Sequence, residues 1–328
     1  MRITHCKGWW LCCFLIIVLV SATAAMAAQE YPTKSIRLIV PFAPGGGTDL
    51  IARMISKGLT ELLGQTVLVD NRPGAGGVTG ANLVAKAAPD GHTLLMGTPG
   101  PLTINPNLRS KIPYDPLKDF SPICLTTISP FILVLNPAVP AKTVKELIAL
   151  AKAKPDALNF GSAGNGAVSH LAGERFKALT GIQIVHVPYK GGGQSLIDLL
   201  SGQVQIVIEN LPVVLPHIRS GKLRALAVGT KKRSTLVPEY PTMREAGVPG
   251  YEQNTSSGVL APAKTPANII EKLNRAIVKT LQKSEFMEQM AAQGVEVIGS
   301  TPEQYAEHLR DELAQYAKVI KTAGIKLE

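Results

Sequence analysis

Glycine-rich loops are the parts of this sequence best suited to binding a ligand. Four times an apolar run is followed by such a loop and then by an amphipathic stretch, in the ranges 40–49, 71–77, 160–166 and 187–193. Glycine lets a backbone approach a ligand closely, and the start of a helix presents unpaired N–H groups with a partial positive charge. Each loop is therefore a candidate anion site, although a tight turn explains the glycines of any single loop equally well.

The four loops fall into two pairs, one in each half of the chain. In an open α/β sheet such loops gather at the carboxyl ends of the strands, where ligands bind. We therefore expect the pairs to face each other across a cleft and to close on a small carboxylate. Asp49 could cap a helix or bind a ligand amine or hydroxyl, and Lys190 could add positive charge to the site or face solvent.

Motifs for other chemistry are incomplete. A dinucleotide fingerprint would need glycine at Thr79 or Leu50, and the sequence has no phosphate-binding Gly-Lys-Ser/Thr and no Gly-x-Ser-x-Gly. Cys124 lies in an expected connector without a histidine nearby in sequence. His170 and Glu174 are four residues apart and could bind a metal, but a surface or capping pair is the favoured interpretation. We expect no catalytic residue, metal or cofactor, although an exported α/β enzyme acting on an acidic substrate remains the alternative.

The composition indicates a globular protein without a nucleic-acid surface. The chain has 328 residues, 45% of them hydrophobic and 18% charged, which is enough for about two domains. The net charge of +10 is thinly spread, and the basic run at 231–233 has no interleaved aromatic residue. We therefore expect no nucleic-acid partner.

The amino terminus predicts export. Residues 1–28 combine a positive start at Arg2 and Lys7, an apolar run from Trp9 to Val20, and small residues with an Ala-x-Ala cleavage site at 25–27. This is the pattern of a cleavable secretory signal peptide. Its removal would leave Cys124 as the single cysteine, which fits a bacterial periplasmic protein without disulfides.

The remaining chain predicts an α/β fold with a parallel sheet covered by helices. Strands are expected at 36–40, 67–69, 93–96, 131–135, near 159, and at 182–187, 204–208 and 223–228, and helices at 50–63, 77–88, from 143, and at 266–283, 284–292 and 302–323. A proline-rich connector at 99–122 separates two domains. Because the C-terminal helices cannot bury their apolar faces alone, we expect domain 1 at 29–127 plus 254–328 and domain 2 at 128–253.

At the glycine loops the chain resembles the Bug-type periplasmic solute-binding receptors, the binding component of tripartite tricarboxylate transporters. The likeness runs over nearly the whole mature chain. The matching motifs lie at 40–49, 71–77, 89–95, 119–123, 160–164, 170–174, 186–191, 241–247 and 260–262.

The resemblance implies a two-domain, Venus-flytrap (type II) binding protein that captures a small organic anion, a carboxylate, and delivers it to membrane permease subunits. It also implies a monomer in the periplasm. A receptor that feeds a signalling partner would share these features. By likeness, the ligand-binding residues map onto Phe42, Ala43, Pro44, Gly45, Gly46, Gly47, Thr48, Asp49, Thr98, Ser162, Ala163, Tyr189, Lys190, Glu209 and Asn210.

One departure from the family pattern bears on the cleft. Many relatives carry Trp-aromatic-Gly where this chain has Ser256-Ser257-Gly258. The missing ring is expected to widen the cleft or to change how it closes.

Overall fold

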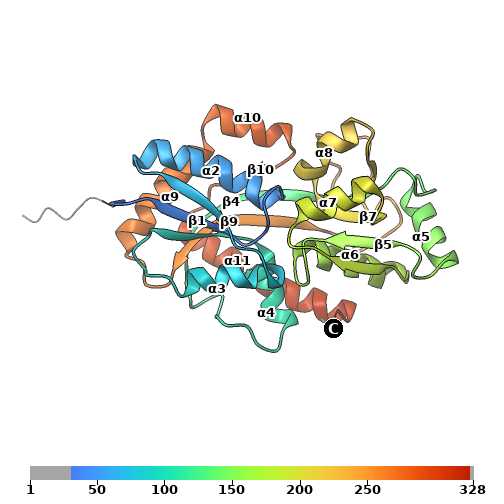
Figure 1. Ribbon diagram of the computed structural model, residues 1–328, viewed down its shortest axis with the longest axis horizontal. Coiled ribbons are helices and arrows are strands. Elements are labelled where there is room, and N and C mark those ends of the chain that lie inside the picture. The colour runs from blue at the N-terminus through green and yellow to red at the C-terminus, as the bar shows by residue number, and fades with distance from the viewer. Residues whose placement is uncertain (1–30, 326–328) are drawn as a thin grey trace, which may run out of the picture.

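A computed structural model describes residues 31–325 as two lobes that share a sheet (Figure 1). The signal peptide expected at 1–28 lies outside the described residues. The first lobe contains the following elements: β1 (Ile36–Val40), α2 (Gly47–Leu63), β2 (Val67–Asn71), the 3-10 turn η1 (Ala75–Gly77), α3 (Val78–Ala85), β3 (Thr93–Gly97), the π-helical turn η2 (Gly100–Ile104), α4 (Asn105–Leu108), α9 (Ala267–Leu281), α10 (Ser284–Ala292), β10 (Glu296–Val297) and α11 (Pro302–Ala323).

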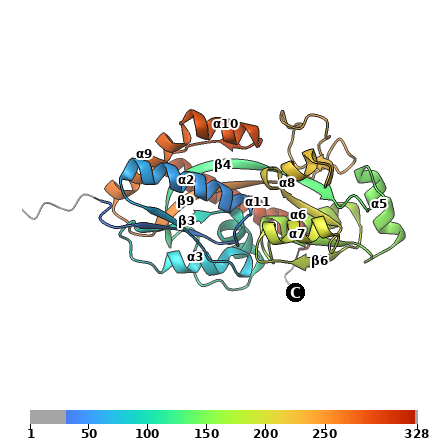
Figure 2. The same ribbon diagram turned by 45° about the horizontal axis from the view of Figure 1, so that its top comes forward.

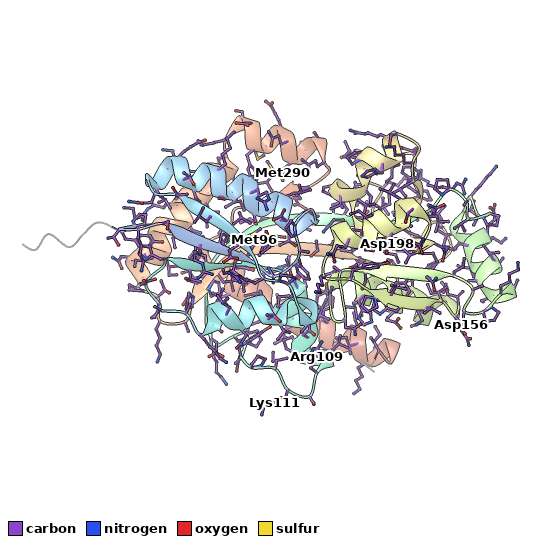
Figure 3. All side chains as sticks on the ribbon, viewed as in Figure 1. Met96, Arg109, Lys111, Asp156, Asp198 and Met290 are labelled. Carbon is purple, nitrogen blue, oxygen red and sulfur yellow. The ribbon has the colours of Figure 1, made fainter. Side chains whose placement is uncertain are left out.

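The second lobe has its own strands and helices, and the chain passes between the lobes in two further strands. The second lobe contains α5 (Val144–Ala153), β5 (Asn159–Ser162), α6 (Val168–Thr180), β6 (Val185–Pro188), α7 (Gly192–Ser201), β7 (Ile206–Asn210), α8 (Leu211–Arg219) and β8 (Arg224–Val228). The shared strands are β4 (Phe120–Leu135) and β9 (Asn254–Pro262). In Figure 3, Met96 and Met290 mark the first lobe, and Asp198 and Asp156 mark the second.

The sheet is mixed, so the expectation of a parallel sheet is wrong in part. Its order is β2-β1-β3-β9-β4-β7-β5-β6, with β8 and β10 also paired to β4. The pairs β1–β2, β1–β3, β5–β6 and β5–β7 are parallel, as expected for strand–loop–helix units. Every pair made by β4 and β9 is antiparallel. The α/β class is confirmed.

Strand β4 also corrects the expected connector at 99–122. The strand begins at Phe120, eleven residues before the strand predicted at 131–135, and residues 100–108 form η2 and α4. Its first part pairs with β9 as far as Pro130, and from Phe131 onward it pairs with β7 and β8. Cys124 therefore lies in a strand rather than a connector, and burial raises the pKa of its thiol to about 12.

The hydrophobic cores follow the two lobes, and α11 contributes to both. In the first lobe, β1 is buried except at Arg37, and its apolar side chains share a core with one face of α2. Helix α2 is followed by Gly64 in the left-handed conformation at φ +67°. Helix α11 begins with a capping box between Thr301 and Gln304. Its Tyr305 packs in a first-lobe core and its Tyr316 in the main core of the second lobe, so the helix runs beneath the shared strands (Figures 1 and 2).

Within residues 31–325, none of the helices combines the length and apolar character that a membrane crossing requires.

Candidate functional site

The four glycine-rich loops meet where the lobes touch. The N–H of Ala43, which follows β1, donates to the carbonyl of Lys190, which follows β6, at 3.0 Å. At the second contact, a Cβ added to Gly76 would collide with the backbone carbonyl oxygen of Asn165. The expected facing of the loop pairs is therefore present, and the lobes are in contact through backbone at both places.

Asn105, at the start of α4, ties the second contact together. Its buried side-chain amide donates to the carbonyls of Gly76 and Gly100 in the first lobe at 3.3 and 2.9 Å. The same amide donates to the carbonyl of Gly166 in the second lobe at 3.0 Å. The Asn105 side chain thus bridges the lobes. A Cβ added to Gly166 would collide with this side chain, so the position requires glycine.

A pocket partly open to solvent is lined by residues next to both contacts, and the space in it, together with the adjoining solvent, amounts to about 410 Å³. Both lobes and both shared strands line it, through Phe42, Gly46, Gly47, Thr48, Thr98, Phe131, Ala163, Ala167, Val168, Ser169, Gly192, Glu209, Asn210 and Thr255. No lysine, arginine or histidine is among these residues.

Four helices begin at this pocket. The first turns of α2, α6 and α7 contribute Gly47, Val168 and Gly192, and Asn210 is the N-cap residue of α8. None of the four has a side-chain cap, whereas Thr143 caps α5 on the far side of the second lobe. Because the first N–H groups of a helix lack intrahelical partners, they are available to bind an anion. The pocket therefore offers positive potential from backbone rather than from side chains.

Several polar side-chain atoms at the pocket are buried and have no hydrogen-bond partner. They are Thr98 Oγ1, Glu209 Oε2 and Asn210 Oδ1. A buried polar atom without a partner is costly unless a ligand or water supplies one. These atoms mark the places where a bound solute would make hydrogen bonds.

The structure divides the site residues predicted from the sequence into two groups. Eight of them line the pocket: Phe42, Gly46, Gly47, Thr48, Thr98, Ala163, Glu209 and Asn210. The other seven do not: Ala43, Pro44, Gly45, Asp49, Ser162, Tyr189 and Lys190.

Asp49 supports the first glycine loop from behind. Its carboxylate accepts hydrogen bonds from the Gly45 N–H at 3.1 Å, Arg53 Nε at 2.9 Å and Asn71 Nδ2 at 3.0 Å. Burial alone would raise the pKa of Asp49, but these hydrogen bonds outweigh it and lower the pKa below its usual value. Asp49 therefore reaches back to the loop N–H that precedes α2, which is close to one of its two predicted roles, but it is not a helix cap because α2 has no side-chain cap.

Tyr189, Lys190 and Ser162 also hold the loops in place. The Tyr189 hydroxyl donates to Asp198 on α7 at 2.6 Å, and the Lys190 N–H donates to Gln194 Oε1 at 3.1 Å while its carbonyl makes the contact with Ala43. Ser162 Oγ lies 2.6 Å from His186 Nε2 and accepts from the Gly164 N–H. None of the three presents its side chain to the pocket.

Sequence reasoning missed six residues of the pocket. They are Phe131, Ala167, Val168, Ser169, Gly192 and Thr255. Gly192 lies in the glycine-rich loop 187–193, and the start of α6 follows the loop 160–166 directly. The expected helix starts could therefore have indicated these residues. Phe131 and Thr255 come from the shared strands, where no local motif indicates a ligand.

The pair of His170 and Glu174 does not form a metal site. His170 Nδ1 accepts from the Gly166 N–H at 3.2 Å, while Glu174 pairs with Lys177 at 2.9 Å. No group of three or more metal-binding side chains comes together among the described residues. The favoured interpretation as a surface or capping pair was wrong for the pair, because His170 is buried and each residue binds a different group.

His170 instead packs against His186 with the two rings tilted by 33° and their centroids 4.4 Å apart. Burial, together with nearby positive charge, lowers the pKa of His170 to about 4 and that of His186 to about 3. Both rings are therefore neutral in the folded protein at neutral pH. Protonating either ring would place a charge in a buried site, which costs free energy.

We expect this histidine pair to destabilise the protein as the pH falls below 6.5. The unfolded chain takes up protons at the ordinary histidine pKa, whereas the folded rings resist them, so stability is full above pH 6.5 and declines below it. The free energy of unfolding of the wild type relative to His186→Gln should decrease by about 1 kcal/mol between pH 7 and pH 5.5. Urea unfolding measures it, and a pH-independent difference would contradict it. His217→Gln, at a partly exposed imidazole near the end of α8, is the control.

The sequence comparisons agree with this architecture. The model of the tripartite tricarboxylate transporter family receptor matches residues 51–325. Protein BugT of Bordetella pertussis is 42% identical over 315 residues, which cover 96% of this chain and 97% of that protein.

Solved structures of similar proteins are periplasmic binding proteins. The periplasmic binding protein BugD is 34% identical with a TM-score of 0.88, covering 91% of this chain and 100% of that one. Rpa4515 of R. palustris, solved with adipate, is 39% identical with a TM-score of 0.87 and covers 90% and 99%. MatC of Rhodopseudomonas palustris, solved with bound malate, is 34% identical with a TM-score of 0.86 and covers 88% and 100%. The two-domain periplasmic binding protein fold expected from the sequence is therefore confirmed.

Proposed function

The chain belongs to the tripartite tricarboxylate transporter receptor family, and we propose that it captures a small dicarboxylate between its lobes for delivery to a membrane permease. The observation that supports this most is the convergence of four uncapped helix starts from both lobes on one pocket without a cationic side chain. Closed around an anion, these N–H groups act in a water-poor site, where each hydrogen bond is stronger. The adipate and malate in the related structures belong to the same chemical class.

A binding role is favoured over catalysis because the Ser–His pair near the pocket, Ser162 and His186, is unsuited to nucleophilic catalysis. Ser162 does not line the pocket, and the pKa of about 3 for His186 leaves that imidazole a weak base at neutral pH. The receptor is proposed to work as a monomer in the periplasm, exported by the signal peptide expected at 1–28. Its domains are proposed to be 29–127 plus 254–328 and 128–253.

Closure is proposed to be the signal that the permease reads. Two lobes joined by paired strands can move as rigid bodies, and a ligand that touches both lobes favours the closed arrangement. Genes for permease subunits beside this gene would support delivery to a transporter, whereas a neighbouring sensor kinase gene would support signalling.

The proposal is tested by a panel of succinate, malate, glutarate and adipate. We expect at least one acid to raise the melting temperature of the purified mature protein at pH 6, because a ligand that binds only the folded state stabilises it. Native mass spectrometry of protein purified without refolding should detect the same class of acid. The absence of a shift with all four acids, together with an acid-free mass, would refute the proposal.

Thr98→Val is expected to weaken binding of the acid found in this panel by about 10-fold. Valine keeps the shape of the side chain but removes a buried hydroxyl that faces the pocket without a partner, a loss of about 1 kcal/mol or slightly more. The matched control is Thr127→Val, since Thr127 is equally buried and its hydroxyl also lacks a partner, but it lies outside the pocket. Isothermal titration calorimetry of both variants measures the effect, and equal affinities would show that Thr98 does not contact the ligand.

A further inference from the structure

A carboxyl group lies where this pocket would hold its anion. Glu209 is the one ionisable side chain among the described residues that line the pocket, and it is only 4% exposed. It occupies the end of β7, opposite Ile132 of β4, so its backbone is fixed by the sheet. A site built to attract an anion thus contains a group that would repel one when ionised.

The two carboxyl oxygens of Glu209 have different surroundings. Oε1 accepts a hydrogen bond from the Asn210 N–H at 2.9 Å. Oε2 is buried without a partner and lies beside the first residue of α7, where a Cβ on Gly192 would come within 2.5 Å of it. One oxygen is therefore used by the protein and the other is left for the contents of the pocket.

No nearby positive charge keeps Glu209 ionised. Burial raises its pKa to about 7, and the Asn210 N–H lowers it only partly. Three titratable groups on helices that begin at the pocket have other partners: Asp49 binds Arg53, Asp198 accepts from Tyr189, and His170 accepts from Gly166. Strand β4, which packs against β7, carries no charged residue. The shift therefore comes from burial, not from charge.

Two neighbouring carboxylates in a buried site cannot both stay ionised, but they can share one proton. We propose, resting on the proposed function, that Glu209 Oε2 holds one carboxylate of a dicarboxylate ligand through a shared proton, so that capture takes up one proton. The new bond is a hydrogen bond from the protonated Glu209 carboxyl to a ligand carboxylate oxygen. No covalent bond changes, and the proton comes from solvent.

The proposal makes capture dependent on pH in a definite direction. Below pH 6 the free protein already carries the proton, so binding takes up almost none. Above pH 7 the proton must be bound together with the ligand, and the affinity should fall about 10-fold per pH unit. A ligand held by backbone N–H groups alone would show no such dependence above pH 7, since the dicarboxylates are almost fully ionised there.

The test is isothermal titration calorimetry of the mature wild-type protein with succinate, glutarate, adipate and malate, in phosphate and Tris buffers at pH 8 and in phosphate and Bis-Tris buffers at pH 6. The difference in enthalpy between the buffers gives the number of protons taken up. We expect about one proton per bound acid at pH 8 and nearly none at pH 6. Glu209→Gln, whose amide can donate in place of the protonated carboxyl, should bind without proton uptake and without the pH dependence. The control Glu285→Gln, at an exposed ion pair with Lys57, should keep both.

Each other result overturns the proposal. Binding of an acid at pH 8 without proton uptake refutes the shared proton while leaving the proposed function intact. Binding of malate but not of adipate, without uptake, would show that an ionised Glu209 accepts from a ligand hydroxyl instead. Proton uptake that persists in Glu209→Gln would place the proton on another group. If that variant does not fold, the proton uptake of the wild-type protein at pH 8 is the deciding measurement. Failure of all four acids to bind at pH 6 would refute both proposals together.

Discussion

Gly76→Ala is expected to lower the affinity for the dicarboxylate by at least about 100-fold without unfolding the protein. The added methyl group would collide with the Asn165 carbonyl oxygen and come within 3.0 Å of the Gly166 backbone, across the contact between the lobes. These atoms are backbone and cannot move aside as a side chain does. The variant can relieve the collision with the second lobe only by keeping the lobes apart, which breaks the pocket into two halves. A further close approach, to Asn105 Nδ2 at 2.9 Å, lies within the first lobe and remains when the lobes separate.

The left-handed backbone of Gly76, at φ +65°, adds a second cost, which a matched control removes. Gly64 has nearly the same conformation, at φ +67°, and a methyl group there would meet no atom within 4 Å. The left-handed backbone should cost both Gly64→Ala and Gly76→Ala about 1 kcal/mol of stability, and Gly76→Ala loses somewhat more because its methyl group also approaches Asn105 Nδ2. Only Gly76→Ala should lose affinity. Calorimetric titration and thermal unfolding measure the two quantities. Equal affinities in both variants would show that ligand capture does not need this contact.

Glu209→Gln is expected to stabilise the ligand-free protein increasingly as the pH rises. The folded state raises the pKa of Glu209 to about 7, whereas the unfolded chain ionises near 4.5. The contribution of this carboxyl group to the free energy of unfolding is therefore fully present below pH 4.5 and is lost as the pH rises to 7. Relative to the wild type, the free energy of unfolding of the variant should increase by about 3 kcal/mol between pH 4.5 and pH 8.

Urea unfolding at several pH values measures this difference, with no dicarboxylate present. The exposed carboxylate of Glu285 provides the control, because Glu285→Gln should show a nearly constant difference over the same range. A constant difference for Glu209→Gln as well would mean that the buried carboxyl does not titrate abnormally. The difference in the free energy of unfolding between Glu209→Gln and the wild type would measure how much stability the protein loses by having a carboxyl group in its pocket.

The local pattern was sufficient to predict the parallel parts of the fold. Strand 36–40 and helix 284–292 occur with the predicted boundaries, and helix 302–323 begins at its predicted Thr301 cap. Periodicity and capping are local signals, so a single segment carries them. The glycine loops were found for the same reason, since each combines a strand end with a helix start.

The shared strands could not be predicted in this way. Pro122 and Pro130 suggest a break, yet both lie within β4, where irregular register accommodates the first of them. The run from Thr255 to Ser257 is polar but buried, because its neighbours in the sheet and the side chains of Thr126 and Glu312 bind it. Such partners are more than fifty residues away in sequence, so no local pattern reveals them.

The same reason explains which part of the candidate site was missed. Phe131 and Thr255 reach the pocket from β4 and β9, and their positions depend on the pairing of those strands. In the opposite direction, Tyr189 and Asp49 stand next to glycine loops but turn their side chains toward Asp198 and Arg53. Sequence proximity to a loop indicates the region of a site, and the side-chain partners decide which residues face the ligand.

Strand β4 also limits how this molecule can be divided or recombined. One continuous stretch, Phe120–Leu135, supplies pairing partners to the strands of both lobes. A gene cut at the lobe boundary would leave each half with an unsatisfied sheet edge, which invites aggregation. A chimera that exchanges one lobe for that of a relative must therefore carry matching segments of both crossing strands. The two lobes can fold and be exchanged only as one unit.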